Sequence, residues 1–227
     1  MLASPSPAQP ILSIPPLENG DRLSRAEFER RYQAMPQVKK AELIEGVTYM
    51  ASPLRIRSHG EPHGNLIGWL WSYKIATPGI VLGDNPTVRL DLDNEPQPDA
   101  VLFIPGRQAA ISEDDYIEGA PELVVEIAAS SAAIDLHDKK RVYRRNGVQE
   151  YLVWRTLEGQ IDWFGLQADE YVSLTADERG IVRSRVFPGL WLAVAAMLSG
   201  EMALVLAELQ HGLSSAEHDE FKQGLLG

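Results

Sequence analysis

Three residues in the middle of the chain have the types and the spacing that metal-assisted hydrolysis requires. Asp99 and Glu126 each lie in an apolar, strand-like run, and Lys139 follows on a polar, helix-like segment. Carboxylates are hard oxygen ligands that suit Mg²⁺ or Mn²⁺, and an ammonium group can steady an attacking water or a developing anion. The same pattern is also typical of two ordinary strand-end acids and a solvated lysine. Spacing alone does not separate the two interpretations.

The relative direction of the two strands determines whether the carboxylates meet. We predict strands over residues 99–104 and 122–128, so that Asp99 begins one strand and Glu126 lies near the end of the next. An antiparallel pair brings the two carboxylates together, whereas a parallel pair leaves them roughly 13 Å apart along the strands. We interpret residues 105–121 as an irregular loop, and parallel neighbours normally need a crossover helix. We therefore expect antiparallel strands.

Glu126 is surrounded in the sequence by apolar residues, so its carboxylate emerges from a strand that otherwise has the composition of a buried one. An unpaired charge there is costly, and a metal ion or a lysine is the usual remedy. The alternative is an ion pair with Arg89 or Arg141.

Lys139 lies on a charged helix that we predict over residues 135–146, with Gly147 as the C-terminal glycine. Asp135, Lys139 and Tyr143 share one face of this helix because they are one turn apart. An Asp135–Lys139 pair on a solvated surface is the simpler interpretation of that face. The remaining cations of the helix form either a phosphate-facing patch or an ordinary solvated surface; they are Lys140, Arg141, Arg144 and Arg145.

Two histidines, His59 and His63, are four residues apart near the start of a predicted helix. Pro62 lies between them and no glutamate follows the first, so the pair does not match the H-E-x-x-H zinc pattern. His59 is placed to contact a phosphate from a helix N-terminus, although capping or plain exposure would explain it as well.

The remaining patterns predict one α/β domain over residues 21–227, preceded by a flexible Pro-rich arm over residues 1–20. The predicted elements are a helix at 24–35 with Ser24 and Glu27 as a capping box, a hairpin at 42–52 that turns at Glu45–Gly46, a helix at 62–75, strands at 87–92, 151–155, 160–164 and 170–174, and apolar helices at 190–198 and 200–212. We expect the last two helices to pack on the sheet, and a homodimer contact is the alternative.

The composition narrows the classes of function. The chain has 227 residues, 44% hydrophobic and 23% charged, which are ordinary values for a globular protein. The absence of cysteine excludes disulfides and thiolate metal sites and agrees with a cytoplasmic location. No apolar run is long enough to span a membrane. The formal net charge of −11 disfavours a broad basic surface for nucleic acid, although a bound metal would add local positive charge.

An ordered series of motifs resembles the Uma2 (DUF820) family of the PD-(D/E)XK restriction-endonuclease-like superfamily. The motifs are ELIEG (42–46), His59, VRLDLDNEPQPDAVLFI (88–104), PELVVEI (121–127), DLHDKKRVYRRNGVQEYLVW (135–154) and VFPGLW (186–191). The resemblance implies a restriction-endonuclease-like core, with a central mixed β-sheet flanked by helices. In that resemblance Pro98-Asp99 corresponds to the PD element and Glu126 to the (D/E) position.

The same resemblance implies a metal-dependent endonuclease that hydrolyses phosphodiester bonds in DNA, with Asp99 and Glu126 holding Mg²⁺ or Mn²⁺. Ala128 occupies the position of the motif lysine, and the resemblance points instead to Lys139 on the following helix, where it would orient the attacking water. Glu42, His59 and Tyr143 are expected to support the site. The displaced lysine and the acidic charge favour the alternative, a catalytically inactive nuclease-like binding module. A metal-dependent hydrolase of small phosphoesters is the weakest alternative.

Overall fold

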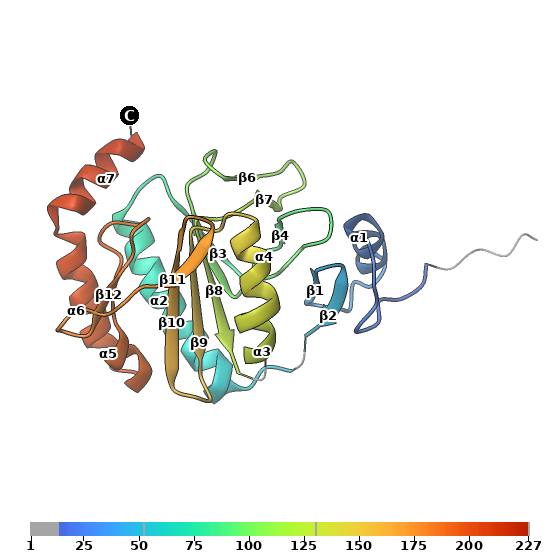
Figure 1. The fold of residues 1–227 in the computed structure, drawn as a ribbon, viewed down its shortest axis with the longest axis horizontal. Helices are drawn as coiled ribbons and strands as arrows, with labels where there is room; N and C mark the ends of the chain where they lie inside the picture. The colour runs from blue at the N-terminus through green and yellow to red at the C-terminus, as the bar shows by residue number, and fades with distance from the viewer. Residues whose placement is uncertain (1–13, 52, 130, 227) are drawn as a thin grey trace, which may run out of the picture.

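A six-stranded sheet forms the centre of the protein in the computed structural model, which describes residues 14–51, 53–129 and 131–226 (Figure 1). Its strand order is β11-β10-β9-β8-β5-β3. The strands are β3 (Val81–Asp84), β5 (Ala100–Phe103), β8 (Leu123–Ala128), β9 (Glu150–Arg155), β10 (Gln160–Gln167) and β11 (Glu170–Ser173).

The sheet is mixed. Within the described residues it has one parallel pair of neighbouring strands, and a helical segment connects the two strands of that pair. β8 and β9 run parallel, whereas β5 runs antiparallel to both β3 and β8. A parallel pair needs a crossover connection. Here that connection is α3 (Ala132–Ile134), the π-helical turn η2 (Asp135–Lys139) and α4 (Lys140–Arg145). The predicted antiparallel pairing of the strands that carry Asp99 and Glu126 is confirmed, as is the class of a mixed sheet flanked by helices.

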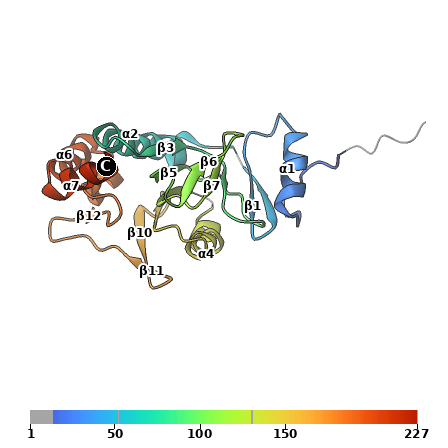
Figure 2. The ribbon, with the colours of Figure 1, turned by 90° about the horizontal axis from the view of Figure 1, so that it is seen from above.

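Strand alternation divides the core into two layers. Val125 and Ile127 of β8 face a large cluster under α2 (Glu61–Ala76), α5 (Val194–Ser199) and α6 (Met202–Leu213). Val124 and Ala128 face a second cluster that includes Tyr143 of α4. Figure 2 shows α2 and α4 on opposite sides of the sheet. Because successive side chains alternate between faces, Glu126 is directed to the α4 side.

The N-terminal elements pack at one end of the sheet and close a third, smaller core. They are α1 (Arg25–Gln33) and the hairpin of β1 (Ala41–Ile44) and β2 (Val47–Met50). The predicted turn is confirmed: Glu45 and Gly46 both have positive φ, at 52° and 70°, as a tight two-residue hairpin requires. The predicted capping box is wrong, because the Ser24 side chain makes no cap hydrogen bond and Glu27 pairs with Arg30 and Arg31 instead.

Three predicted elements differ from the structure. The strand predicted over 87–92 is only β4 (Val88–Arg89), because residues 91–94 turn back on themselves. The segment interpreted as a loop contains β6 (Ala109–Ile111) and β7 (Ile117–Gly119), which form a small sheet with β4. The helix predicted over 190–198 begins only at Val194, since β13 (Trp191–Ala193) pairs with β12 (Ile181–Arg183).

The C-terminal helices pack as expected. Leu190, Val205 and Leu209 belong to the large core cluster beside the sheet, and α7 (Ala216–Leu226) follows α6 around the same side. No helix among the described residues is long and apolar enough to cross a membrane. Most of the predicted arm, residues 1–13, lies outside the described residues. Leu17 is buried against the hairpin, and the boundary at residue 20 stays a prediction.

Candidate active site

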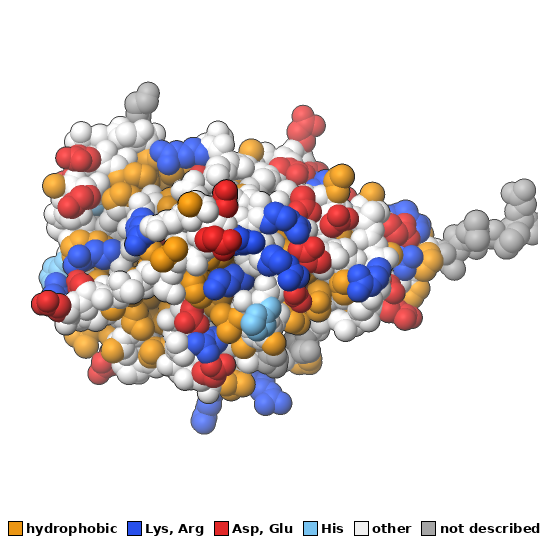
Figure 3. Space-filling model, viewed as in Figure 1, with side chains coloured by type: hydrophobic (Ala, Val, Ile, Leu, Met, Phe, Trp, Pro, Cys, Tyr) orange, Lys and Arg blue, Asp and Glu red, His pale blue; other side chains and the backbone are white. Residues whose placement is uncertain are grey.

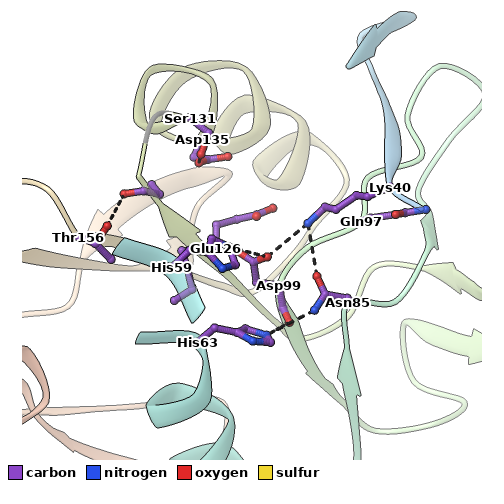
Figure 4. A network of polar contacts seen from close by, with 12 residues as sticks. Lys40, His59, His63, Asn85, Gln97, Asp99, Glu126, Ser131, Asp135 and Thr156 are labelled. Atoms are coloured by element: carbon purple, nitrogen blue, oxygen red, sulfur yellow. Dashed lines mark hydrogen bonds and ion pairs between the residues drawn. The ribbon is translucent and has the colours of Figure 1, made fainter. Parts of the chain in front are cut away.

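A cleft of about 780 Å³ opens where the β1–β2 hairpin, the π-helical turn η1 (Ile56–Gly60) and η2 meet the ends of β5 and β8. The charged and histidine side chains that line it come from five segments of the chain, as Figure 4 shows in part. They are Lys40, Glu42, Arg55, His59, Asp99, Glu126, Asp135 and Lys139.

Asp99 and Glu126 face each other across neighbouring strands. Ala100 of β5 pairs with Val125 of β8, so continuing the antiparallel register by one residue places Asp99 opposite Glu126. Both side chains are 3% exposed, and both belong to the face of the sheet that α4 covers. The pairing of two short strands therefore brings together carboxylates that are far apart in the sequence.

The carboxylate of Asp99 is held in its ionised form by three donors. Its Oδ2 accepts the Ile127 N–H at 2.7 Å, while Lys40 Nζ and His59 Nε2 each lie 3.3 Å from Oδ1. Burial by itself raises the pKa of Asp99. The hydrogen bond from His59 and the charge of Lys40 outweigh burial, and the pKa lies well below its usual range.

Glu126 lies in a more acidic environment. Its Oε1 accepts hydrogen bonds from Lys139 Nζ and from the Tyr143 hydroxyl, both at 2.9 Å. Burial raises the pKa of Glu126 to about 8, since the charges of neighbouring carboxylates add to burial and outweigh the attraction of Lys139. Release of that proton is therefore a condition for Glu126 to bind a cation.

Lys139 is the centre of a cluster of acids. Its side chain is 5% exposed, and its Nζ lies 2.8 Å from Glu42 Oε1, 2.9 Å from Glu126 Oε1 and 3.7 Å from Asp135 Oδ1. Burial lowers the pKa of Lys139, but the three carboxylates outweigh it and raise the pKa well above the usual value. The interpretation of Asp135 and Lys139 as a solvated surface pair is wrong, because both side chains are buried.

The structure brings together the expected residues Glu42, His59, Asp99, Glu126 and Lys139 at one cleft, with Tyr143 behind Glu126. The alternative partners suggested for Glu126 are both engaged elsewhere. Arg89 pairs with Glu29, Asp114 and Glu118, and Arg141 pairs with Asp138.

Three charged residues of the cleft, Lys40, Arg55 and Asp135, were not singled out as site residues from the sequence. Lys40 contacts Asp99, and Asp135 contacts Lys139 and accepts a hydrogen bond from Ser131 at 2.6 Å. A signal for Lys40 was present, because residues two apart on an extended segment share a face and Lys40 precedes Glu42 by two. His63 lies beside this group, with its Nε2 3.1 Å from Asp84 Oδ1.

The carboxylates of the cleft suit a hard divalent cation by their charge, but they do not supply a complete set of ligands for one. Four carboxylates, two lysines and Arg55 line the cleft, so a small excess of negative charge remains there once Glu126 releases its proton. Within the part of the chain that the structure describes, no group of three or more His, Asp or Glu side chains is arranged to hold a metal ion. The side chains of Asp99 and Glu126 are the carboxylates that face each other, so water or substrate oxygens would complete the coordination.

The fold and the facing carboxylates define a restriction-endonuclease-like protein. The model of the Uma2 family, described as "Putative restriction endonuclease", matches residues 25–195, and the chain belongs to this family. A crystal structure from Anabaena variabilis, described as "a putative nuclease belonging to DUF820", is similar to this chain with a TM-score of 0.56 and 16% identity. The match covers 75% of this chain and 96% of that one, and it shows the shared fold. No curated protein matches the chain.

Proposed function

We propose that this protein is a metal-dependent endonuclease that hydrolyses phosphodiester bonds in DNA, with Asp99 and Glu126 holding Mg²⁺ or Mn²⁺. The observation that carries the proposal is the pair of buried carboxylates on facing antiparallel strands at the floor of a cleft. Membership of a restriction-endonuclease-like family supports the same reaction class.

A bound divalent ion would offset phosphate charge and lower the pKa of a bound water. The protein contributes preorganisation of the two ligands. His59, Lys40 and the Ile127 N–H keep Asp99 ionised and fix its orientation. Lys139 and Tyr143 hold one oxygen of Glu126. Both carboxylates are thereby fixed before substrate arrives, Asp99 through both of its oxygens and Glu126 through one. A rigid site of this kind limits the cost of binding its ion.

The two lysines are suited to different roles. Lys139 is enclosed and directs its ammonium group at Glu42 and Glu126, so it is suited to positioning these acids. The Lys40 side chain is 24% exposed, and its contacts to Asp99 and Asn85 are long, at 3.3 and 3.5 Å. We assign to Lys40 the contact with the scissile phosphate or the attacking water that the family motif would give to its own lysine.

A nicking assay on supercoiled plasmid tests the proposed function. Wild type should nick DNA in the presence of Mg²⁺ or Mn²⁺. The nicking rates of Asp99→Asn and Glu126→Gln should be at least about 100-fold lower than that of wild type. The same two variants should show no Mn²⁺ binding by calorimetry. Asp219→Asn, an exposed acid on α7, is the matched control and should behave as wild type. RNA and small phosphoesters are offered in parallel.

The alternative of a catalytically inactive binding module predicts a different result. In that case wild type would bind DNA but nick neither DNA nor RNA with either metal. Equal nicking by Asp99→Asn and wild type would overturn the proposed role of the acid pair.

A further inference from the structure

The mouth of the cleft carries two large apolar side chains that are open to solvent. Leu54 is 66% exposed and Leu157 is 71% exposed, and both line the same cleft as Asp99 and Glu126. Leu54 precedes η1, whereas Leu157 lies in the turn between β9 and β10. Single exposed apolar side chains are common, but these two lie at the mouth of one cleft, where a bound substrate would meet them.

The two leucines belong to one continuous surface. The Thr156 hydroxyl donates a hydrogen bond to the Ser58 carbonyl oxygen at 2.7 Å, which ties the β9–β10 turn to the start of η1. Thr156 lies beside the cleft in Figure 4. The residue next to Thr156 is Leu157, so this bond fixes the position of one leucine relative to the segment that carries the other.

Two arginines lie on the segment that carries Leu54, and the first of them, Arg55, also lines the cleft. Arg55 and Arg57 are both exposed, and among the described residues neither has an ion pair with an acid. Figure 3 shows Lys and Arg side chains projecting at the lower edge of the molecule, where Figure 1 places the segment that leads into α2. The segment of residues 53–58 contains no acid, which is uncommon in a chain with a net charge of −11.

The cations of α4 provide a contrast. Arg141, Arg144 and Arg145 pair with Asp138, Glu170 and Glu45 respectively, and Lys140 lies over the ring of Phe164 at 3.4 Å. Their charges are thus largely neutralised within the protein. Other exposed cations also lack an acidic partner among the described residues, including Arg22, Lys39, Arg107 and Arg185, but Arg55 is the arginine that lines the cleft, and Arg57 follows it on the same segment.

We propose that this cleft rim, defined as Leu54, Arg55, Arg57 and Leu157, engages duplex DNA by inserting its leucines at a base step while its arginines contact flanking phosphates. Aliphatic side chains act as wedges that unstack and kink a duplex, whereas single-strand binders rely on aromatic side chains. The most exposed large apolar side chains of this cleft are the two leucines, and its tyrosine, Tyr49, is only partly exposed. The inference rests on the proposed function. It names the substrate class as duplex DNA that is easily kinked, such as flexible pyrimidine–purine steps or mismatches.

Binding and bending of a doubly labelled duplex of about 30 base pairs without divalent metal test the inference. Wild type should bind, shorten the end-to-end distance by fluorescence transfer, and bind a duplex with a central mismatch more tightly than a matched one. Leu54→Ala/Leu157→Ala should still bind but lose most of the bending and the preference for the mismatch. Arg55→Gln/Arg57→Gln should lower the slope of log K against log salt by about 2, because each lost phosphate contact removes roughly 0.9.

Matched controls separate these effects from general losses. Leu204→Ala removes a leucine of α6 that is 55% exposed, and Arg141→Gln/Arg144→Gln removes two arginines that have acidic partners. Both controls should bend DNA and depend on salt as wild type does.

The outcomes distinguish the inference from the proposed function. If wild type nicks plasmid while the leucine variant bends and nicks equally well, the rim proposal fails and the nuclease proposal stands. If wild type bends duplexes but never nicks with Mg²⁺ or Mn²⁺, the nuclease proposal fails and the rim proposal stands. Tight binding to single strands only, or a wild-type dimer that the leucine variant dissociates in sedimentation, would show a different occupant and overturn the rim proposal.

Discussion

Lys40 and Lys139 carry the same charge at the same cleft, but their surroundings give them different energetic roles. Lys139 lies among three carboxylates with 5% of its side chain exposed, whereas Lys40 contacts one carboxylate with 24% exposed. Removing a buried partner leaves the opposite charges unpaired in a poorly solvated space, and that loss is much larger than the loss of a solvent-exposed pair.

Replacing each lysine by methionine keeps most of the length of the side chain and removes the charge. We expect Lys139→Met to lower the free energy of unfolding by about 3–5 kcal/mol. Lys40→Met should lower it by less, about 1–2 kcal/mol, because Asp99 keeps its donors His59 and the Ile127 N–H. Urea denaturation followed by circular dichroism measures both. Nicking activity, compared for the folded fraction of each variant, should fall more in Lys40→Met than in Lys139→Met. Equal stability losses in the two variants would contradict the assignment of Lys139 as the positioning residue.

Tyr143 supports Glu126 through a single hydrogen bond. Tyr143→Phe keeps the ring against Tyr151 but leaves Glu126 Oε1 without one of its two donors. We expect a loss of about 1–3 kcal/mol in unfolding free energy and weaker Mn²⁺ binding. Tyr171→Phe is the matched control, since its hydroxyl donates to the Val148 carbonyl oxygen, and it should leave Mn²⁺ binding unchanged.

At the scale of elements, α6 approaches the segment before β13 very closely. Gly189 has φ of +87°, and a Cβ at Gly212 would collide with the Gly189 carbonyl oxygen and lie 2.9 Å from Trp191 Cγ. Only the absence of side chains at both glycines lets the helix pack on the β12–β13 pair. Val205 and Leu209 of α6 depend on this close packing for their burial in the large core cluster.

Gly212→Ala tests this close approach. We expect it to destabilise the protein by about 1–3 kcal/mol, because the helix must move away from the segment it packs on. Gly224→Ala on α7 is the control: its Cβ would meet nothing within 4 Å, so the lower entropy of the unfolded chain should make it neutral or stabilising by about 0.5–1 kcal/mol. Thermal unfolding that ranks Gly212→Ala at or above Gly224→Ala would rule out the close contact.

Both π-helical turns carry residues of the cleft. His59 lies in η1, and Asp135 and Lys139 lie in η2. A π turn contains an extra residue relative to an α turn, so it changes the direction of the side chains around it, and such turns are frequent at functional sites. Periodicity correctly predicted a helix with Asp135, Lys139 and Tyr143 on one face, but it could not show that a short α turn at Ala132–Ile134 and then a π turn precede the α-helical part.

At the scale of the whole molecule, several acids are buried, and three of them, Glu95, Glu122 and Glu150, lie outside the cleft. Glu95 is 3% exposed beside Glu29 and Arg89, and burial together with Glu29 raises the pKa of Glu95 to about 8. Arg89 Nε lies 2.8 Å from Glu29 Oε1 and 3.8 Å from Glu95 Oε2, but among the described residues neither oxygen accepts a well-aligned hydrogen bond. A proton on Glu95 supplies such a hydrogen bond, so the folded protein holds a proton that the unfolded chain releases above its ordinary pKa of 4.5.

This proton makes stability fall as pH rises. Its contribution is fully present below pH 4.5 and is lost progressively as pH rises to about 8. Glu95→Gln keeps a hydrogen-bond donor at every pH. The unfolding free energy of the variant minus that of wild type should therefore be larger at about pH 9 than at about pH 5, by at least about 1 kcal/mol. Urea titrations at the two pH values measure the difference, and a gap that does not change with pH would contradict the protonated state of Glu95.

Local patterns in the sequence determined the hairpin turn at Glu45–Gly46, the antiparallel strands and the charged crossover helix, whereas Glu42 was expected at the cleft only from the family resemblance. The first three features depend on periodicity, turn chemistry and connection length, which act over a few residues. The short strands β6, β7 and β12 were missed because pairing with partners distant in the chain, rather than their own composition, makes them strands.

Only the tertiary structure decided what surrounds each charge. It placed Lys40 against Asp99, enclosed Lys139 among three acids, paired the arginines of α4 and left Arg55 and Arg57 free of acidic partners among the described residues. Burial and opposite charges set the behaviour of an ionisable group, and both come from segments far apart in the chain. The sequence therefore determined which acids could face each other, and the fold determined which lysine remains open to a substrate.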